Sequence, residues 1–229
     1  MKFLDSLKFP QKMSLVILSF LLPIGVLLYH VVYRYNFEAQ WSRLESYGNK
    51  YQRPLESLLK LIPEHGFMAT RYAHSKNVDI KDALGGKQVE IDKAFDRLAQ
   101  ADSQVGTDLQ FTDEGLGKRK RLHFKVNTVK SEWDSLKSGW AAMSPEALAD
   151  KHSHLVADIK TMIVHSGDTS LLILDPDLDS YYLMDITLLA LPQTQDRLIG
   201  ITQGGWDILR AKGDRPLNRA ERTQFATWS

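Results

Sequence analysis

The chain has 229 residues, of which 29 are Lys or Arg and 28 are Asp or Glu, so its net charge is only +1. A nearly neutral chain lacks the global field that would attract nucleic acid or an anionic surface. It contains no cysteine, which excludes disulfides, thiolate metal sites and a cysteine nucleophile. We therefore expect no nucleic-acid partner.

The first predicted element is a helix over residues 13–33, because this stretch contains no Asp, Glu, Lys or Arg. At ~1.5 Å per residue it is about 31 Å long, enough for one passage through a bilayer. A cleaved secretory signal is the competing interpretation, but the stretch is too long for one and no small-residue cleavage pattern follows it. We predict an uncleaved transmembrane helix.

The orientation of this helix follows from the two segments that flank it. Basic residues lie on both sides, so the positive-inside rule gives only a weak bias. A long domain tends to be translocated regardless of its charge. We therefore predict that residues 1–12 are a cytoplasmic stub and that residues 34–229 lie outside the cytoplasm.

Helical periodicity continues along the rest of the chain and predicts an all-α fold. The clearest seam has steps of four and three: Leu122, Val126, Val129, Trp133, Leu136 and Trp140. Such spacing places apolar side chains on one helix face. A second seam of this kind includes His152 and Ser166, which we expect to be hydrogen-bonded core residues. No segment shows the alternation typical of a strand.

Capping residues divide this periodic region into helices. Ser144 before Pro145 and Asp175 before Pro176 are typical N-caps, and Asn218 with Glu221 resembles a capping box. The predicted helices lie near 35–62, 66–104 with a break at the two glycines 85 and 86, 113–141, 145–174, 176–212 and from 218 onward. The first should continue the transmembrane helix. Short connections predict an up-and-down bundle of one module or two stacked modules.

The stretch 174–185 has the highest density of acidic and aromatic residues. Alternating Asp175, Asp177 and Asp179 suggest calcium, but the calcium-loop template requires Gly and Glu where Ser180 and Ile186 stand. An acidic first helical turn, stabilised by the helix dipole, explains these aspartates without a metal ion. We expect no metal in this segment.

Two groups of residues are candidates for binding a small molecule. His65, Gly66, Arg71 and Tyr72 are predicted at a helix start after Pro63, where a guanidinium group could hold a carboxylate. Tyr182 and Asp185 lie inside a predicted helix, where a buried carboxylate needs a partner. We predict that Arg71, Tyr182 and Asp185 border a polar pocket; a purely structural ion pair between Arg71 and a buried carboxylate is the alternative.

Two further patterns have a structural explanation. His152 and His154 are two residues apart and so lie on different helix faces, unlike a metal-binding pair four residues apart. The basic run from Lys118 to Arg121 is explained by a solvated helix face. We found no nucleophile elbow, phosphate-binding glycine loop or zinc signature, and we predict no catalytic residue, no metal, no cofactor and no enzyme activity for this portion.

The stretch from Leu171 to Asp185 resembles a motif in the periplasmic helical sensor regions of bacterial methyl-accepting chemotaxis proteins. The order of a basic stub, one anchor and a helical domain is similar to theirs. Such receptors often carry His-Arg-Gly where this chain has Glu64, His65 and Gly66, so the arginine is displaced or missing. Similar input regions occur on sensor histidine kinases and diguanylate cyclases.

The resemblance implies a chemoreceptor sensor half that detects a small periplasmic solute and signals across the inner membrane, with a kinase or cyclase input region as the alternative. It also implies a homodimer and cytoplasmic signalling partners reached through a further C-terminal region. A passive anchor or scaffold without a ligand is a third interpretation.

Overall fold

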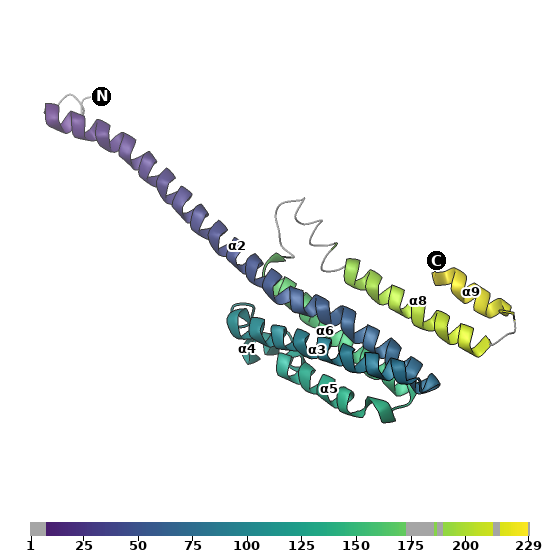
Figure 1. Ribbon diagram of the computed structural model, residues 1–229. Helices are drawn as coiled ribbons and strands as arrows, with labels where there is room; N and C mark the ends of the chain where they lie inside the picture. The colour runs from purple at the N-terminus through teal and green to yellow at the C-terminus, as the bar shows by residue number, and fades with distance from the viewer. Residues whose placement is uncertain (1–7, 173–185, 187–189, 213–215, 229) are drawn as a thin grey trace. The chain divides into compact units, whose positions relative to one another are not determined.

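The computed structural model describes residues 8–172, 186, 190–212 and 216–228 (Figure 1). Within these ranges the chain is helical and contains no strand, so the all-α prediction is confirmed. The chain divides into two compact units, Met1–Arg43 and Leu44–Ser229, each of which is described by itself.

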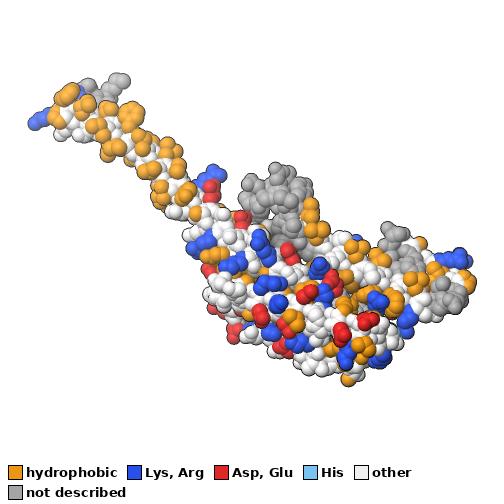
Figure 2. Space-filling model, in the orientation of Figure 1, with side chains coloured by type: hydrophobic (Ala, Val, Ile, Leu, Met, Phe, Trp, Pro, Cys, Tyr) orange, Lys and Arg blue, Asp and Glu red, His pale blue; other side chains and the backbone are white. Residues whose placement is uncertain are grey.

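The first unit contains the N-terminal part of helix α2, which runs from Phe9 to Ser75. Its apolar side chains are exposed from Met13 to Tyr33, and hydrophobic atoms cover this part of the helix in Figure 2. The helix is long and apolar enough to cross a membrane. Residues 13–33 and 35–62 lie on one helix, as predicted, because α2 contains both ranges.

The second unit contains a four-helix bundle made by α2, α3 (Val78–Val105), α5 (Val126–Gly139) and α6 (Pro145–Thr169). Contacts show that neighbouring helices are antiparallel. Along α2, Tyr51 pairs with Asp102 of α3 and His65 with Gln88; His65 also meets His152 of α6. The predicted up-and-down arrangement is therefore present in these four helices.

The bundle core is built from the periodic apolar positions. Trp133 is fully buried, and its indole N–H donates to Asp92 Oδ1 at 2.9 Å. Tyr51 is also buried; it stacks on Phe111 with ring centroids 4.2 Å apart. The first contact joins α5 to α3, and the second joins α2 to the segment between α3 and α4. The burial of Trp133 agrees with the predicted seam.

Several predicted boundaries are wrong. The helix expected over 113–141 is divided into α4 (Asp113–Lys118), the short 3-10 helix η1 (Leu122–Phe124), α5 and the 3-10 helix η2 (Trp140–Ala142). Lys120 has a φ of 57°, a conformation that ends a right-handed helix. Leu122, predicted in the seam, is consequently exposed.

Two further breaks do not occur. Helix α3 continues through Gly85 and Gly86, since Leu84 and Ile91 are fully buried on either side. Packing of this kind outweighs a cost of about 1 kcal/mol for each glycine in a helix. Helix α2 likewise continues through Pro63 to Ser75.

The remaining helices are α8 (Leu191–Lys212) and α9 (Arg219–Trp228). The capping box is confirmed, because Glu221 N–H donates to Asn218 Oδ1 at 2.9 Å and Asn218 N–H donates to Glu221 Oε2 at 2.8 Å. Helix α8 matches the second half of the helix predicted over 176–212. The predicted cap at Asp175 lies outside the described residues, and a second stacked module stays a prediction.

Candidate ligand-binding site

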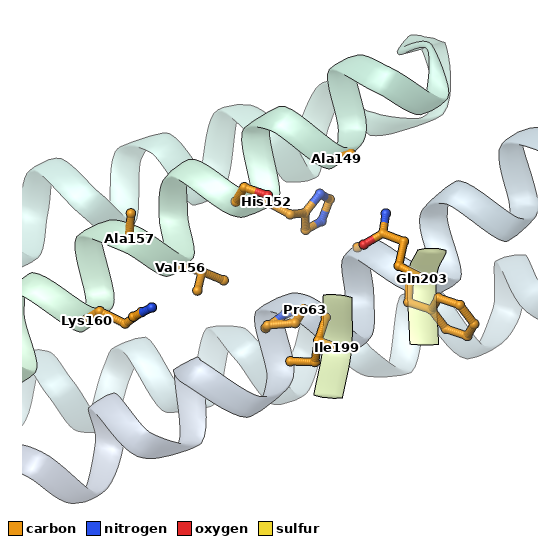
Figure 3. Close-up of a pocket in the computed structure, with 11 residues that line it drawn as sticks. Pro63, Ala149, His152, Val156, Ala157, Lys160, Ile199 and Gln203 are labelled. Atoms are coloured by element: carbon orange, nitrogen blue, oxygen red, sulfur yellow. The ribbon is translucent and has the colours of Figure 1, made fainter. Parts of the chain in front are cut away.

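A cavity of about 290 Å³ lies between α2, α6 and α8 (Figure 3). This volume is close to the lower end of the range typical for small-molecule sites, about 300–1,000 Å³. A second, adjoining hollow of about 530 Å³ lies between α2 and α8. The residues that line the first cavity are Pro63, Gly66, Phe67, Ala149, His152, Ser153, Val156, Ala157, Lys160, Ile199 and Gln203.

The proline in this wall explains how α8 is held on α2. Pro63 has no backbone N–H, so the carbonyl of Leu59 loses its helical partner. The side-chain amide of Gln195 on α8 donates to that carbonyl at 3.4 Å. In a regular helix the Leu59 carbonyl would accept a backbone hydrogen bond. Here it accepts one from α8 instead, and this bond connects α8 to α2.

A buried pair of histidines forms the inner side of the cavity wall. His152 Nδ1 lies 2.6 Å from the carbonyl oxygen of Leu148, so this nitrogen carries the proton. Nε2 of His152 is then an acceptor, and His65 Nδ1 donates to it at 2.8 Å. Gln88 completes the chain by donating its amide N–H to His65 Nε2 at 3.2 Å.

Burial keeps both imidazoles of this pair neutral. Burial lowers the pKa of His65 to about 3, with a further contribution from His152. Burial also lowers the pKa of His152, against the opposing effect of the Leu148 carbonyl. Both ring nitrogens of His152 are already hydrogen-bonded within the protein. The ring therefore forms part of the cavity wall and is not available for proton transfer.

Gly66 allows the histidine pair to pack. A Cβ at this position would lie 2.8 Å from Cγ of His152, which is closer than real Cβ contacts. Any side chain at residue 66 would therefore displace the His152 ring that lines the cavity.

The cavity wall combines apolar surface with a few polar groups. Pro63, Phe67, Val156 and Ile199 supply apolar atoms, and Ser153 and Gln203 add a hydroxyl and an amide. Lys160 adds a positive charge. This composition suits a small organic molecule with an apolar body and a polar or anionic end.

The sequence-predicted pocket residues are only partly described. The guanidinium of Arg71 lies over the rings of Phe67 and Trp206, 5.6 Å and 5.0 Å from their centroids. It is thus next to a cavity residue, in contact with α8. Tyr182 and Asp185 lie outside the described residues, so their predicted pairing with Arg71 stays a prediction.

The predicted cluster at residues 65–72 does not form one site. It was expected at a helix start, but all of it lies inside α2, which ends at Ser75. Because successive helical residues point in different directions, His65 faces the core, Arg71 contacts Trp206, and Tyr72 packs against Trp140 with centroids 5.2 Å apart.

His152 and Ser166 are both buried, as expected of seam residues. His152 is hydrogen-bonded as predicted, whereas the Ser166 hydroxyl has no hydrogen-bond partner among the described residues. The importance of His152 for the cavity was missed, because the sequence does not show that Gly66 lets it approach His65.

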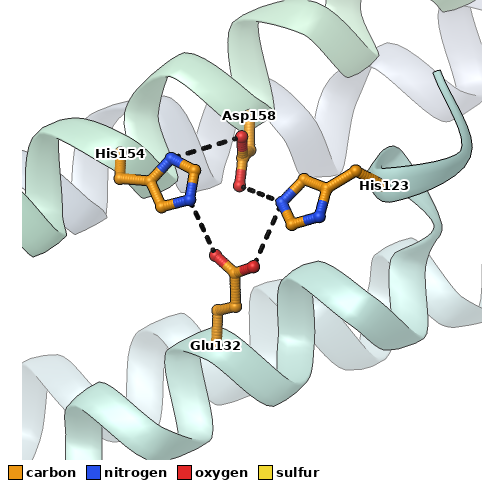
Figure 4. Close-up of side chains that lie close together, drawn as sticks. All are labelled: His123, Glu132, His154 and Asp158. Atoms are coloured by element: carbon orange, nitrogen blue, oxygen red, sulfur yellow. Dashed lines mark hydrogen bonds and ion pairs between the residues drawn. The ribbon is translucent and has the colours of Figure 1, made fainter. Parts of the chain in front are cut away.

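A second group of side chains could hold a metal ion. His123, Glu132, His154 and Asp158 place their potential ligand atoms within 4.8 Å of one another (Figure 4). This cluster was not predicted from the sequence, where only the spacing of His152 and His154 suggested a metal pair. The sequence does contain one indication of the cluster: His154 and Asp158 are four residues apart, which puts both side chains on one helix face.

The comparisons with known proteins give no relative. No protein-family model, curated protein or solved structure matches this chain. The resemblance of residues 171–185 to chemotaxis receptors therefore stays a prediction from the sequence.

Proposed function

We propose that this chain is the sensor portion of a bacterial transmembrane chemoreceptor, with its N-terminus in the cytoplasm and its helical domain in the periplasm. In this proposal a small organic solute occupies the cavity between α2, α6 and α8. The receptor acts as a homodimer and passes the signal to cytoplasmic partners.

The main support for the proposal is the extent of helix α2. Helix α2 contains both the apolar stretch from Met13 to Tyr33 and three residues of the cavity wall, Pro63, Gly66 and Phe67. A solute that contacts this wall acts directly on the helix that would cross the membrane. No intermediate linker is needed between the two sites.

The energetic requirement for signalling is modest. A ligand shifts a two-state receptor only by the difference between its affinities for the two states, and couplings of about 1–3 kcal/mol are typical. A single hydrogen bond to a charged group, such as one from Lys160 to a carboxylate, contributes about 1.5–3 kcal/mol. One such contact made in only one state is therefore sufficient.

The proposal is tested by isothermal titration of the whole chain, purified in detergent, against amino acids and small carboxylic acids. We expect at least one of them to bind. Ala157 lines the cavity and is exposed, so Ala157→Trp should fill the space without disturbing the core and should abolish binding.

Ala99→Trp is the matched control, because Ala99 is also an exposed helical alanine but lies on α3, away from the cavity. Equal affinity in Ala157→Trp and Ala99→Trp would place the ligand elsewhere and refute the proposed site. Arg71→Ala is measured in the same series, and an unchanged affinity would remove Arg71 from the ligand contacts.

A further inference from the structure

Four side chains with metal-ligating atoms converge from three segments of the bundle (Figure 4). His154 and Asp158 lie one turn apart on α6, Glu132 projects from α5, and His123 belongs to η1. Two imidazoles and two carboxylates surround one point, and they come from parts of the chain as distant as residues 123 and 158.

The spacing of these atoms fits a tetrahedral ion. Zinc bonds to nitrogen and oxygen of about 2.0–2.1 Å set neighbouring ligand atoms about 3.3 Å apart. His123 Nε2 lies 3.1 Å from Glu132 Oε1 and 3.2 Å from Asp158 Oδ2. The other oxygen of Glu132 lies 3.6 Å from His154 Nε2. Small side-chain rotations would therefore complete the coordination.

The negative charges of Asp158 and Glu132 also favour the binding of a cation. Asp158 is almost fully buried, with 4% of its side chain exposed, and a buried carboxylate needs a compensating partner. In the part of the chain that the structure describes, neither Asp158 nor Glu132 pairs with a lysine or an arginine. Their partners there are the two histidines.

A single imidazole nitrogen cannot satisfy two carboxylates. Each ring nitrogen carries at most one N–H, yet Nε2 of His123 faces oxygen atoms of Glu132 and Asp158 at once. One carboxylate oxygen would therefore be left without a full hydrogen bond. A divalent cation at the centre would satisfy all four side chains together.

Both ring nitrogens of His154 face carboxylates of the cluster. Nε2 lies 3.6 Å from Glu132 Oε2, and Nδ1 lies 3.7 Å from Asp158 Oδ1. Since either imidazole nitrogen can bind a metal ion, a small rotation of this ring would direct one of them at the ion.

We propose that His123, Glu132, His154 and Asp158 bind a divalent transition metal ion of the zinc type. Imidazole ligands favour such ions, whereas calcium and magnesium prefer oxygen ligands. The bound ion cross-links η1, α5 and α6. The histidine side chains are 43% and 54% exposed, so the ion enters from solvent. This site is independent of the proposed solute cavity.

The test uses the whole chain in detergent, purified without a polyhistidine tag and freed of metal by a chelator that is then removed. Titration with Zn²⁺ should show one ion bound per chain, and Co²⁺ should give the visible absorption of a tetrahedral complex. Excess Ca²⁺ should not compete. Glu132→Gln and His154→Ala change partly exposed side chains, so both variants should fold as judged by circular dichroism.

Each of these two variants should weaken zinc binding by at least about tenfold, since removal of even a supporting contact to a metal ligand costs about 10–100-fold. His74→Ala and Asp134→Asn are matched controls outside the cluster and should bind zinc like the parent chain. Absence of zinc binding, equal affinity in the cluster and control variants, or displacement by Ca²⁺ would each overturn the proposal.

Discussion

Because His65 and His152 are buried as neutral imidazoles, we expect acid to destabilise the bundle. Burial lowers the pKa of His65 to about 3, from an ordinary value of 6.5. Below pH 6.5 the unfolded chain therefore binds a proton that the folded chain excludes. The free energy of unfolding then falls as the pH falls, by about 1.4 kcal/mol per pH unit for this histidine.

The magnitude follows from the two pKa values. Between pH 7.5 and pH 4.5, the contribution of His65 to stability should decrease by about 2–3 kcal/mol. The decrease continues until the pH reaches about 3, the pKa of the folded state. The lowered pKa of His152 acts in the same direction.

Urea unfolding followed by circular dichroism, at a series of pH values, measures this effect. His65→Gln removes the titrating group, so its stability should depend on pH less steeply than that of the parent chain between pH 6.5 and pH 4.5. His74→Gln is the matched control, because His74 also lies on α2 but takes no part in the network. Equal slopes for the parent and His65→Gln would refute the neutral-pair interpretation.

Five further predictions concern packing, docking and placement in the membrane. Gly66→Ala should lower the free energy of unfolding by about 1–3 kcal/mol, because its Cβ would overlap His152. By contrast, Gly85→Ala should raise it by about 0.5–1 kcal/mol, because a Cβ at Gly85 has no atom within 4 Å; effects of the same sign in urea unfolding would contradict this account. Trp133→Ala should cost about 3–5 kcal/mol, since Trp133 is fully buried, and a loss within about 0.5 kcal/mol by the same assay would mean that the seam faces water. Gln195→Ala should increase hydrogen exchange in α8 relative to α5, because it removes the bond to the Leu59 carbonyl; unchanged protection of α8 would show that this bond does not hold it. Protease added to the periplasmic face of oriented inner-membrane vesicles should degrade the chain beyond residue 40 and spare the first dozen residues, and the reverse pattern would invert the predicted topology.

The parts of the fold that depend on local rules could be predicted from the sequence. Ser144 caps α6 as expected, accepting a hydrogen bond from Ala147 N–H at 3.2 Å. The periodic positions around Trp133 are buried, as their spacing indicated. Both features depend on residues close together in the chain.

Features that depend on distant residues could not be predicted in the same way. Pro63 was expected to end a helix, but Gln195 compensates for the missing backbone donor from 132 positions further along the chain. The cluster of His123, Glu132, His154 and Asp158 comes from three separate segments. Periodicity places a residue on a helix face, but it does not say which faces meet.

In the proposed function, the cavity between α2, α6 and α8 controls helix α2, and cross-linking of α2 between two copies of the chain measures this control. The chain has no cysteine, so Phe37→Cys, at an exposed position of α2, introduces a single reactive thiol. In membranes, the rate of disulfide formation between copies should change when the solute identified by titration is added at saturation. The same solute should have no effect in Phe37→Cys combined with Ala157→Trp. An unchanged rate in the chain that binds the solute would show that the cavity does not control α2.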